Sequence, residues 1–291
     1  MQYFISVLLS GIAVGGQYAL IAIGYTMVYG ILRLINFAHG DTYMWGACFA
    51  LLFARMHIPF IPALLLTMIC TGLLSVTIEF LCYRRLRNVP RVIVTASALG
   101  ASIVLSNAAL VLIGADVYTV PSFFEVRYFT LGTIVVNSMQ FMLLGCAVIL
   151  MLALTLFINK TKFGRAIRAT SENMDVTSLM GINTNTIISL TFFIGAALAG
   201  AAGMLVGIYY DAVYSTMGYM AGMKAFTAAI LGGIGSIPGA MLGSLVLGQI
   251  ESFGTTYISS SMGPAISFAV LILVLLVRPT GFFGGGDAKA N

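Results

Sequence analysis

The sequence predicts an all-α protein that crosses a membrane several times. Hydrophobic residues make up 60% of the 291-residue chain and charged residues only 8%, whereas soluble domains carry about 25% charged residues. The apolar runs are long enough for helices of about 20 residues, which span a bilayer, and they lack the alternating segments of an outer-membrane barrel. Helices satisfy their backbone hydrogen bonds internally in lipid. We therefore expect one polytopic domain over residues 1–291, with about eight transmembrane helices, some of them broken or re-entrant.

Composition and motifs argue against other classes of protein. The net charge of +5 comes from basic residues at the predicted membrane edges, which membrane orientation explains without a nucleic acid partner. The chain has no G-x-x-x-x-G-K-[ST] phosphate loop and only two histidines, so we expect no ATP site of its own, no enzyme activity and no cofactor. The four cysteines lie in or at the end of apolar runs without metal-ligand spacing, which predicts free thiols and no metal site.

The first apolar elements flank a polar interruption. Tyr3–Leu32 is an uncharged run of spanning length. The interruption RLINFAHGDTYM, residues 33–44, precedes a second apolar element that ends near Phe53. That element is too short to span unless it begins inside the interruption. A third span is expected from Phe60 to Tyr83.

Basic loops follow the third and the fifth spans. RRLRNVPR, residues 84–91, has four arginines and no acid, so the positive-inside rule places it in the cytoplasm. A fourth span, Val92–Ile113, then leads to an external excursion over Gly114–Thr133. A fifth span, Ile134–Ile158, returns the chain to the basic side, and a sixth, Ile187–Ile208, leaves it again.

The last third of the chain contains a predicted helix break. Within Lys224–Glu251 the run GGIGSIPG, residues 232–239, has four glycines and one proline, which interrupt a helix. The final span, Pro264–Val277, ends at a basic residue. This count puts the N-terminus outside and the C-terminus inside. It requires Lys224–Glu251 to enter and leave on the outer side, as a hairpin of half-helices or a tight pair of helices.

The polar island, residues 160–185 (KTKFGRAIRATSENMDVTSLMGINTN), is the longest hydrophilic stretch. Asn173 suits an N-cap and Gly181 a C′ position, which predicts a short helix over Met174–Met180 after a basic turn over Gly164–Ala169. The apolar side chains of Val176, Leu179 and Met180 on this helix fit docking into a groove of another protein. An interfacial helix that rests on lipid is the alternative. The docking residues we assign are Gly164, Arg165, Arg168, Glu172, Asn173, Asp175, Val176, Leu179, Met180 and Gly181.

The two helix interruptions are candidates for the path of a solute. Broken helices in both halves of a transporter point to its translocation path, although glycines that merely permit close packing are the alternative. The residues we assign are Asn36, His39, Gly40, Asp41, Gly232, Gly233, Gly235, Ser236, Pro238 and Gly239. We place His39 and Asp41 near the inner edge, where a surface or capping role is favoured over a proton relay or metal site.

Three ionisable residues lie inside or beside apolar runs. Glu79 precedes Arg84 by five residues, which predicts an interfacial ion pair. Lys224 and Glu251 flank the second interruption and could face one wet vestibule, since intramembrane charges are functional candidates by default.

Four blocks in order resemble the permeases of branched-chain amino acid ABC importers. They are NFAHGDTYMWGA (36–47), TKFGRAIRATSENMDVTSLMGIN (161–183), KAFTAAILGGIGSIPGAMLG (224–243) and RPTGFFG (278–284). The resemblance covers essentially the whole chain. One departure is Met174, where the family often starts its short helix with proline.

The resemblance implies a bacterial inner-membrane permease with a type II importer-like fold. One interruption follows an outward-to-inward span and the other an inward-to-outward span, which fits two halves of inverted topology. The resemblance also implies a second, related permease, two cytoplasmic ATPase subunits that hold ATP and Mg²⁺, and a periplasmic binding protein. The segment matching residues 164–183 would be the element that touches the ATPases. Urea, short-chain amide and aromatic-acid permeases share nearly the same blocks, so the solute stays open. A stand-alone channel, a secondary transporter and a membrane scaffold are the alternatives from other classes.

Overall fold

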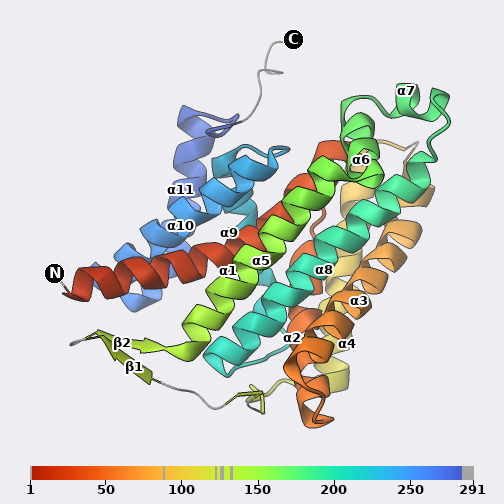
Figure 1. Ribbon diagram of the computed structural model, residues 1–291. Helices are drawn as coiled ribbons and strands as arrows, with labels where there is room; N and C mark the ends of the chain where they lie inside the picture. Colours follow the sequence, from red (N-terminus) through yellow and green to blue (C-terminus); the bar gives the residue numbers. More distant parts are fainter. Residues whose placement is uncertain (1, 88, 122, 125–127, 132–133, 284–291) are drawn as a thin grey trace.

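The computed structural model describes residues 2–283, apart from residues 88, 122, 125–127 and 132–133. It is a helical bundle with one short β-hairpin (Figure 1). The α-helices are α1 (Gln2–Leu32), α2 (His39–Arg55), α3 (Phe60–Ile78), α4 (Arg91–Ile113), α5 (Ser138–Lys160), α6 (Lys162–Glu172), α7 (Met174–Leu179), α8 (Thr184–Tyr210), α9 (Met217–Gly232), α10 (Ile237–Tyr257) and α11 (Gly263–Val277). A π-helix, η1 (Glu79–Tyr83), and two 3₁₀ turns, η2 (Arg84–Leu86) and η3 (Ser260–Met262), complete the helical elements, while β1 (Tyr128–Leu131) pairs antiparallel with β2 (Ile134–Asn137).

The predicted membrane-spanning class is confirmed. Within the described ranges six helices are long and apolar enough to cross a bilayer, and the α9–α10 pair passes the same test as a unit bent by 117°. The expected number of about eight also counts α2, which has 17 residues and falls short of the roughly 20 that span a bilayer. The polytopic helical fold therefore holds, with fewer full-length spans than expected.

Basic residues collect at one end of the bundle, which we call the basic end. There Arg87 donates a hydrogen bond to Asn185 at the start of α8, and Arg168 donates to the Ile158 carbonyl near the end of α5. The opposite end holds β1, β2 and the α8–α9 connection, where Tyr118 pairs with Val213 (Figure 1). The polar island therefore lies at the same end as residues 84–91, the arginine loop, as the sequence predicts.

The α9–α10 pair is a hairpin whose tip lies at the basic end. α9 ends at Gly232, and α10 begins at Ile237 after Ser236 caps it by accepting a hydrogen bond from the Gly239 amide at 3.2 Å. α10 then runs along α1 back to the opposite end. A Cβ on Gly248 would lie 2.4 Å from the Gly15 nitrogen, so this glycine sets the close approach of the two helices. The sequence predicts a hairpin of half-helices or a tight pair of helices for Lys224–Glu251, and the structure has a hairpin whose two helices are bent by 117° at the break.

The chain after α11 returns to the tip of this hairpin. The Phe282 amide donates to the Leu231 carbonyl at 2.9 Å, and the Phe283 amide donates to the Gly232 carbonyl at 3.0 Å. These carbonyls end α9 and have no partner within a helix. The segment that follows the last span therefore satisfies the end of α9.

Two predictions of local structure are wrong. The fifth span begins at Ser138 rather than Ile134, because the intervening residues form β2 and Asn137 then caps α5 by accepting from the Met139 amide at 2.9 Å. The expected basic turn over 164–169 is part of the regular helix α6. Glu125 and Arg127 of the predicted excursion lie outside the described residues.

Candidate functional site

The polar island folds into two short capped helices that project from the basic end (Figure 1). Thr161 caps α6 by accepting a hydrogen bond from the Gly164 amide at 3.0 Å. Asn173 caps α7 by accepting from the amides of Asp175 and Val176, each at 3.0 Å. Gly181 follows with a φ of +81°, a conformation that glycine adopts without strain. The helix predicted over Met174–Met180 therefore forms from its predicted caps and ends one residue early.

An apolar patch covers the outer face of α7. The side chains of Val176, Leu179 and Met180 are 53%, 86% and 77% exposed. Glu172 and Asp175 lie exposed beside them. We call Val176, Leu179 and Met180 the α7 patch. Exposed large apolar groups with a polar rim are typical of a docking surface.

Two of the predicted docking residues hold the polar island on the bundle instead. A Cβ on Gly164 would lie 2.2 Å from the Ile158 carbonyl oxygen, so this residue lets α6 fold back against the end of α5. Arg168 donates to the same carbonyl at 2.6 Å and to Asn159 at 3.0 Å. Arg165 is exposed on α6.

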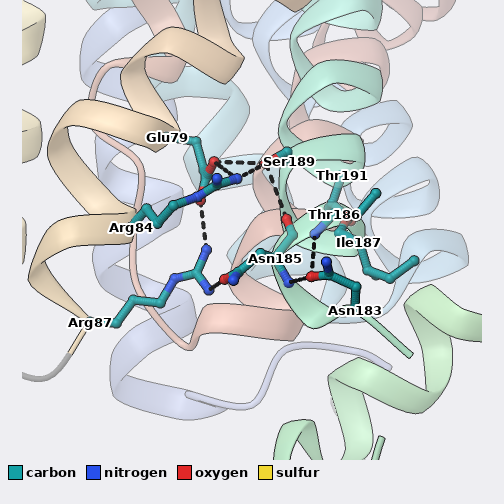
Figure 2. Close-up of polar contacts among 9 residues, drawn as sticks. All are labelled: Glu79, Arg84, Arg87, Asn183, Asn185, Thr186, Ile187, Ser189 and Thr191. Atoms are coloured by element: carbon teal, nitrogen blue, oxygen red, sulfur yellow. Dashed lines mark hydrogen bonds and ion pairs between the residues drawn. The ribbon is translucent and has the colours of Figure 1, made fainter. Parts of the chain in front are cut away.

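A buried carboxylate ties the arginine loop to the start of α8 (Figure 2). Glu79 is fully buried and accepts from Arg84 at 3.1 Å, from Arg87 at 2.6 Å and from the Ser189 hydroxyl at 2.8 Å. The predicted Glu79–Arg84 ion pair is confirmed, and Arg87 and Ser189 extend it. We call Glu79, Arg84, Arg87, Asn185 and Ser189 the Glu79 cluster.

The Glu79 cluster lies where the π-helix η1 contacts the capped start of α8. Glu79 opens the π-helix η1 at the end of α3, and π-turns occur frequently at functional sites. Asn185 accepts from Arg87 and lies in the first turn of α8, which Asn183 caps (Figure 2). Because the polar island ends there, the cluster links α7 to α3 through the start of α8.

The first helix interruption lies inside the bundle. Arg33, directly after α1, has a φ of +54°. α2 begins within the bundle at His39, whose Nε2 contacts the Ile21 carbonyl of α1 at 3.1 Å. Asp41 accepts from the Ser106 hydroxyl of α4 at 2.8 Å. The expected surface role is wrong for both residues, since His39 is 1% exposed and Asp41 3%.

The two interruptions line different cavities. Gly40 and Asp41 border a small cavity of about 50 Å³ near the start of α9. Gly235, Ser236 and Pro238 line another of about 350 Å³ at the basic end, with Arg168 and Glu172 of α6 across it. The structure does not bring the two interruptions together. A role of either one in a solute path stays a prediction.

A third cavity, of about 340 Å³, contains an ion pair. Lys224 of α9 donates to Oε1 of Glu251 of α10. Tyr18 of α1 and Ser267 of α11 each donate to Oε2 of the same carboxylate at 3.0 Å. The predicted vestibule therefore corresponds to a direct contact of these two charges, in a cavity that extends to the α8–α9 connection at Tyr214.

Comparison with known proteins identifies the family. Residues 7–275 match the family described as the permease component of branched-chain amino acid transport systems. The chain belongs to this permease family. The high-affinity branched-chain amino acid transport system permease BraD of Pseudomonas aeruginosa is 43% identical, over 99% of this chain and 98% of its own. LivH of Escherichia coli, with the same description, is 44% identical over 99% and 97%. A probable branched-chain permease of Methanocaldococcus jannaschii is 29% identical over 91% and 88%. No solved structure matches the chain.

Several residues that organise this permease were not singled out from the sequence. Tyr18 and Ser267 lie in apolar runs and carry no motif, yet both bind Glu251. Ser189 binds Glu79 from a helix more than 100 positions away. The only sequence signal for them is a hydroxyl in an apolar run, which also arises when a side chain bonds to its own helix.

Proposed function

We propose that this chain is a membrane-spanning subunit of an ATP-binding cassette importer that moves leucine, isoleucine and valine across the bacterial inner membrane. The proposal is carried by similarity over nearly the full length to permeases named for branched-chain amino acid transport, at 43–44% identity. The chain binds no cofactor of its own. A second, related permease completes the solute path, and a periplasmic binding protein delivers the solute.

The α7 patch is the surface that one of the two ATPase subunits would engage, and the other ATPase would engage the second permease. Its three large apolar side chains are exposed, and the preceding Asn173 cap fixes the helix that carries them. A short helix with apolar anchors fits a groove on a partner. The basic end, which carries α7, then faces the cytoplasm by the positive-inside rule. This orientation leaves the N-terminus in the periplasm and the C-terminus in the cytoplasm.

Movement at α7 would reach the spans through two connections. α6 folds back on the end of α5 through Gly164 and Arg168, and the start of α8 is held to α3 by the Glu79 cluster. ATP binding closes the ATPase pair, and the permease responds by switching between two packings of its helices. The remote nucleotide thus biases the side on which the path is open.

Co-purification and uptake test the proposal together. The whole transporter, extracted through a tag on this chain, is expected to contain a second permease and the ATPases. In liposomes, with the binding protein added, it is expected to take up leucine only when ATP is present on the ATPase side. Uptake without ATP by this chain alone would contradict the proposal and favour a channel or secondary transporter.

A charge on the α7 patch is expected to break the ATPase contact. Leu179→Asp leaves an unpaired carboxylate in an apolar interface, and we expect at least a tenfold loss of ATPase co-purification. Thr186→Ala on the first turn of α8 is the matched control, since it removes a polar group outside the patch. Normal ATPase recovery with Leu179→Asp would rule out docking through this face.

A further inference from the structure

The Lys224–Glu251 ion pair is largely buried inside the helical bundle, where an ionised side chain is energetically costly. Lys224 follows the start of α9 by seven residues, and the side chains of Lys224 and Glu251 are 14% and 11% exposed. Ionisable groups inside a membrane bundle are rare and mark solute or ion paths. A buried ion pair is weak evidence for stability, because apolar residues of similar size often serve as well or better. Its position therefore calls for a function beyond holding helices together.

The cavity around the pair combines charges with an apolar wall. Its lining includes the polar residues Tyr43 of α2 and Tyr210 of α8 and the apolar residues Val14, Met217 and Met220. Its volume of about 340 Å³ falls in the range of about 300–1,000 Å³ that small-molecule sites occupy. The cavity extends to Ala212 and Tyr214 in the α8–α9 connection, at the end of the bundle opposite α7.

A buried amide also lines the cavity. Gln17 is 6% exposed, and its side chain interacts with the Tyr210 hydroxyl. An amide N–H group can donate to a carboxylate oxygen, so this side chain offers a donor to a ligand with an acceptor oxygen.

We propose that this cavity binds the zwitterionic head group of an amino acid during translocation. The α-carboxylate would take the place of Glu251 as the partner of Lys224 and accept from Gln17. The α-ammonium would take the place of Lys224 as the partner of Glu251, whose second oxygen keeps Tyr18 and Ser267. An apolar side chain would lie along Val14 and Met217. This assignment rests on the proposed import of branched-chain amino acids and locates a binding step for it within this chain.

In the ion pair the two charges neutralise each other, so neither buried group is an unpaired ion. A zwitterion brings one charge of each sign and no net charge, so each buried group exchanges one partner for another of the same kind. A neutral amide, a carboxylic acid or an amine offers at most one of the two charges and leaves the other buried group unpaired.

The test compares the whole transporter with a variant that keeps the packing but loses both charges. Lys224→Met/Glu251→Met replaces the pair by side chains of similar length, and Ser252→Ala, which removes a hydroxyl that donates to the Val7 carbonyl outside the cavity, is the matched control. Binding of radiolabelled leucine to the purified whole transporter is measured beside ATP-dependent uptake with the binding protein. We expect the double variant to co-purify with its partners and to lose leucine affinity by about tenfold or more, while Ser252→Ala binds normally.

Competing ligands show whether the site recognises both the α-carboxylate and the α-ammonium group. Unlabelled leucine is expected to displace the label from the wild type, whereas 4-methylpentanoate and 3-methylbutylamine, which each lack one charged group, are expected to compete at least tenfold less well. Leucine binding and uptake by the double variant at the wild-type level would refute the proposed binding site. Equal competition by the carboxylate or the amine would overturn zwitterion recognition. A wild-type transporter that moves no branched-chain amino acid would instead overturn the proposed function.

Discussion

Replacing Glu79 by glutamine is expected to loosen the basic end of the bundle. The carboxylate is fully buried and receives hydrogen bonds from Arg84, Arg87 and Ser189. Removing one partner of a buried ion pair typically costs about 3–5 kcal/mol. The two arginine side chains are 34% and 20% exposed, so water compensates part of their charge. We therefore expect a loss of about 2–3 kcal/mol, which corresponds to a drop in Tm of roughly 5–10 °C.

Thermal unfolding of the purified transporter in detergent measures this drop. Arg85→Gln is the matched control, because the Arg85 guanidinium lies over the Phe80 ring at 5.2 Å and a contact of this kind contributes only about 0.5–1 kcal/mol at an exposed site. Ser189→Ala should fall between the two variants, since it removes one of the three donors. A Tm for Glu79→Gln that equals that of Arg85→Gln would refute the reasoning that the carboxylate holds α3 to α8.

Three further predictions follow from the packing. Gly248→Val should separate α1 from α10, because even a Cβ would lie 2.4 Å from the Gly15 nitrogen; we expect faster proteolysis of the detergent-extracted chain, and unchanged cleavage would argue against this contact. Gly181→Pro cannot adopt the φ of +81° and loses the amide that donates to Ser178 at 3.0 Å; ATPase co-purification should fall while membrane insertion persists, and full recovery would count against the cap. Ser106→Ala deprives Asp41 of a donor at 2.8 Å, which should lower stability by about 1–2 kcal/mol; an unchanged Tm would show that Asp41 has another source of stabilisation.

Local rules explain why the second half of the polar island could be predicted in detail. The Asn173 cap and the positive φ of Gly181 are properties of single residues and their nearest neighbours, so the sequence suffices to place α7. The break after Gly232 follows in the same way from glycine and proline chemistry. The arginine loop and the polar island lie at one end because the charge rule acts on each loop separately.

Tertiary packing explains what the sequence left open. His39 and Asp41 look like residues of a polar loop, but Gly40 lets α2 start beside α9, since a Cβ there would lie 2.5 Å from the Gly218 carbonyl oxygen. That contact joins positions about 180 residues apart, and no local pattern reports it. The same holds for the convergence of Tyr18, Lys224 and Ser267 on Glu251, which requires four helices to be placed at once.

The return of the chain from α11 to the tip of the hairpin has a practical consequence for handling the protein. The amides of Phe282 and Phe283 satisfy the last carbonyls of α9, so a truncation that ends before Phe282 would leave Leu231 and Gly232 with exposed or unpaired acceptors. An affinity tag or a fluorescent protein fused beyond Phe283 leaves both hydrogen bonds in place. The fusion point for purifying the intact transporter is thus set by two backbone contacts rather than by the last apolar residue of the final span.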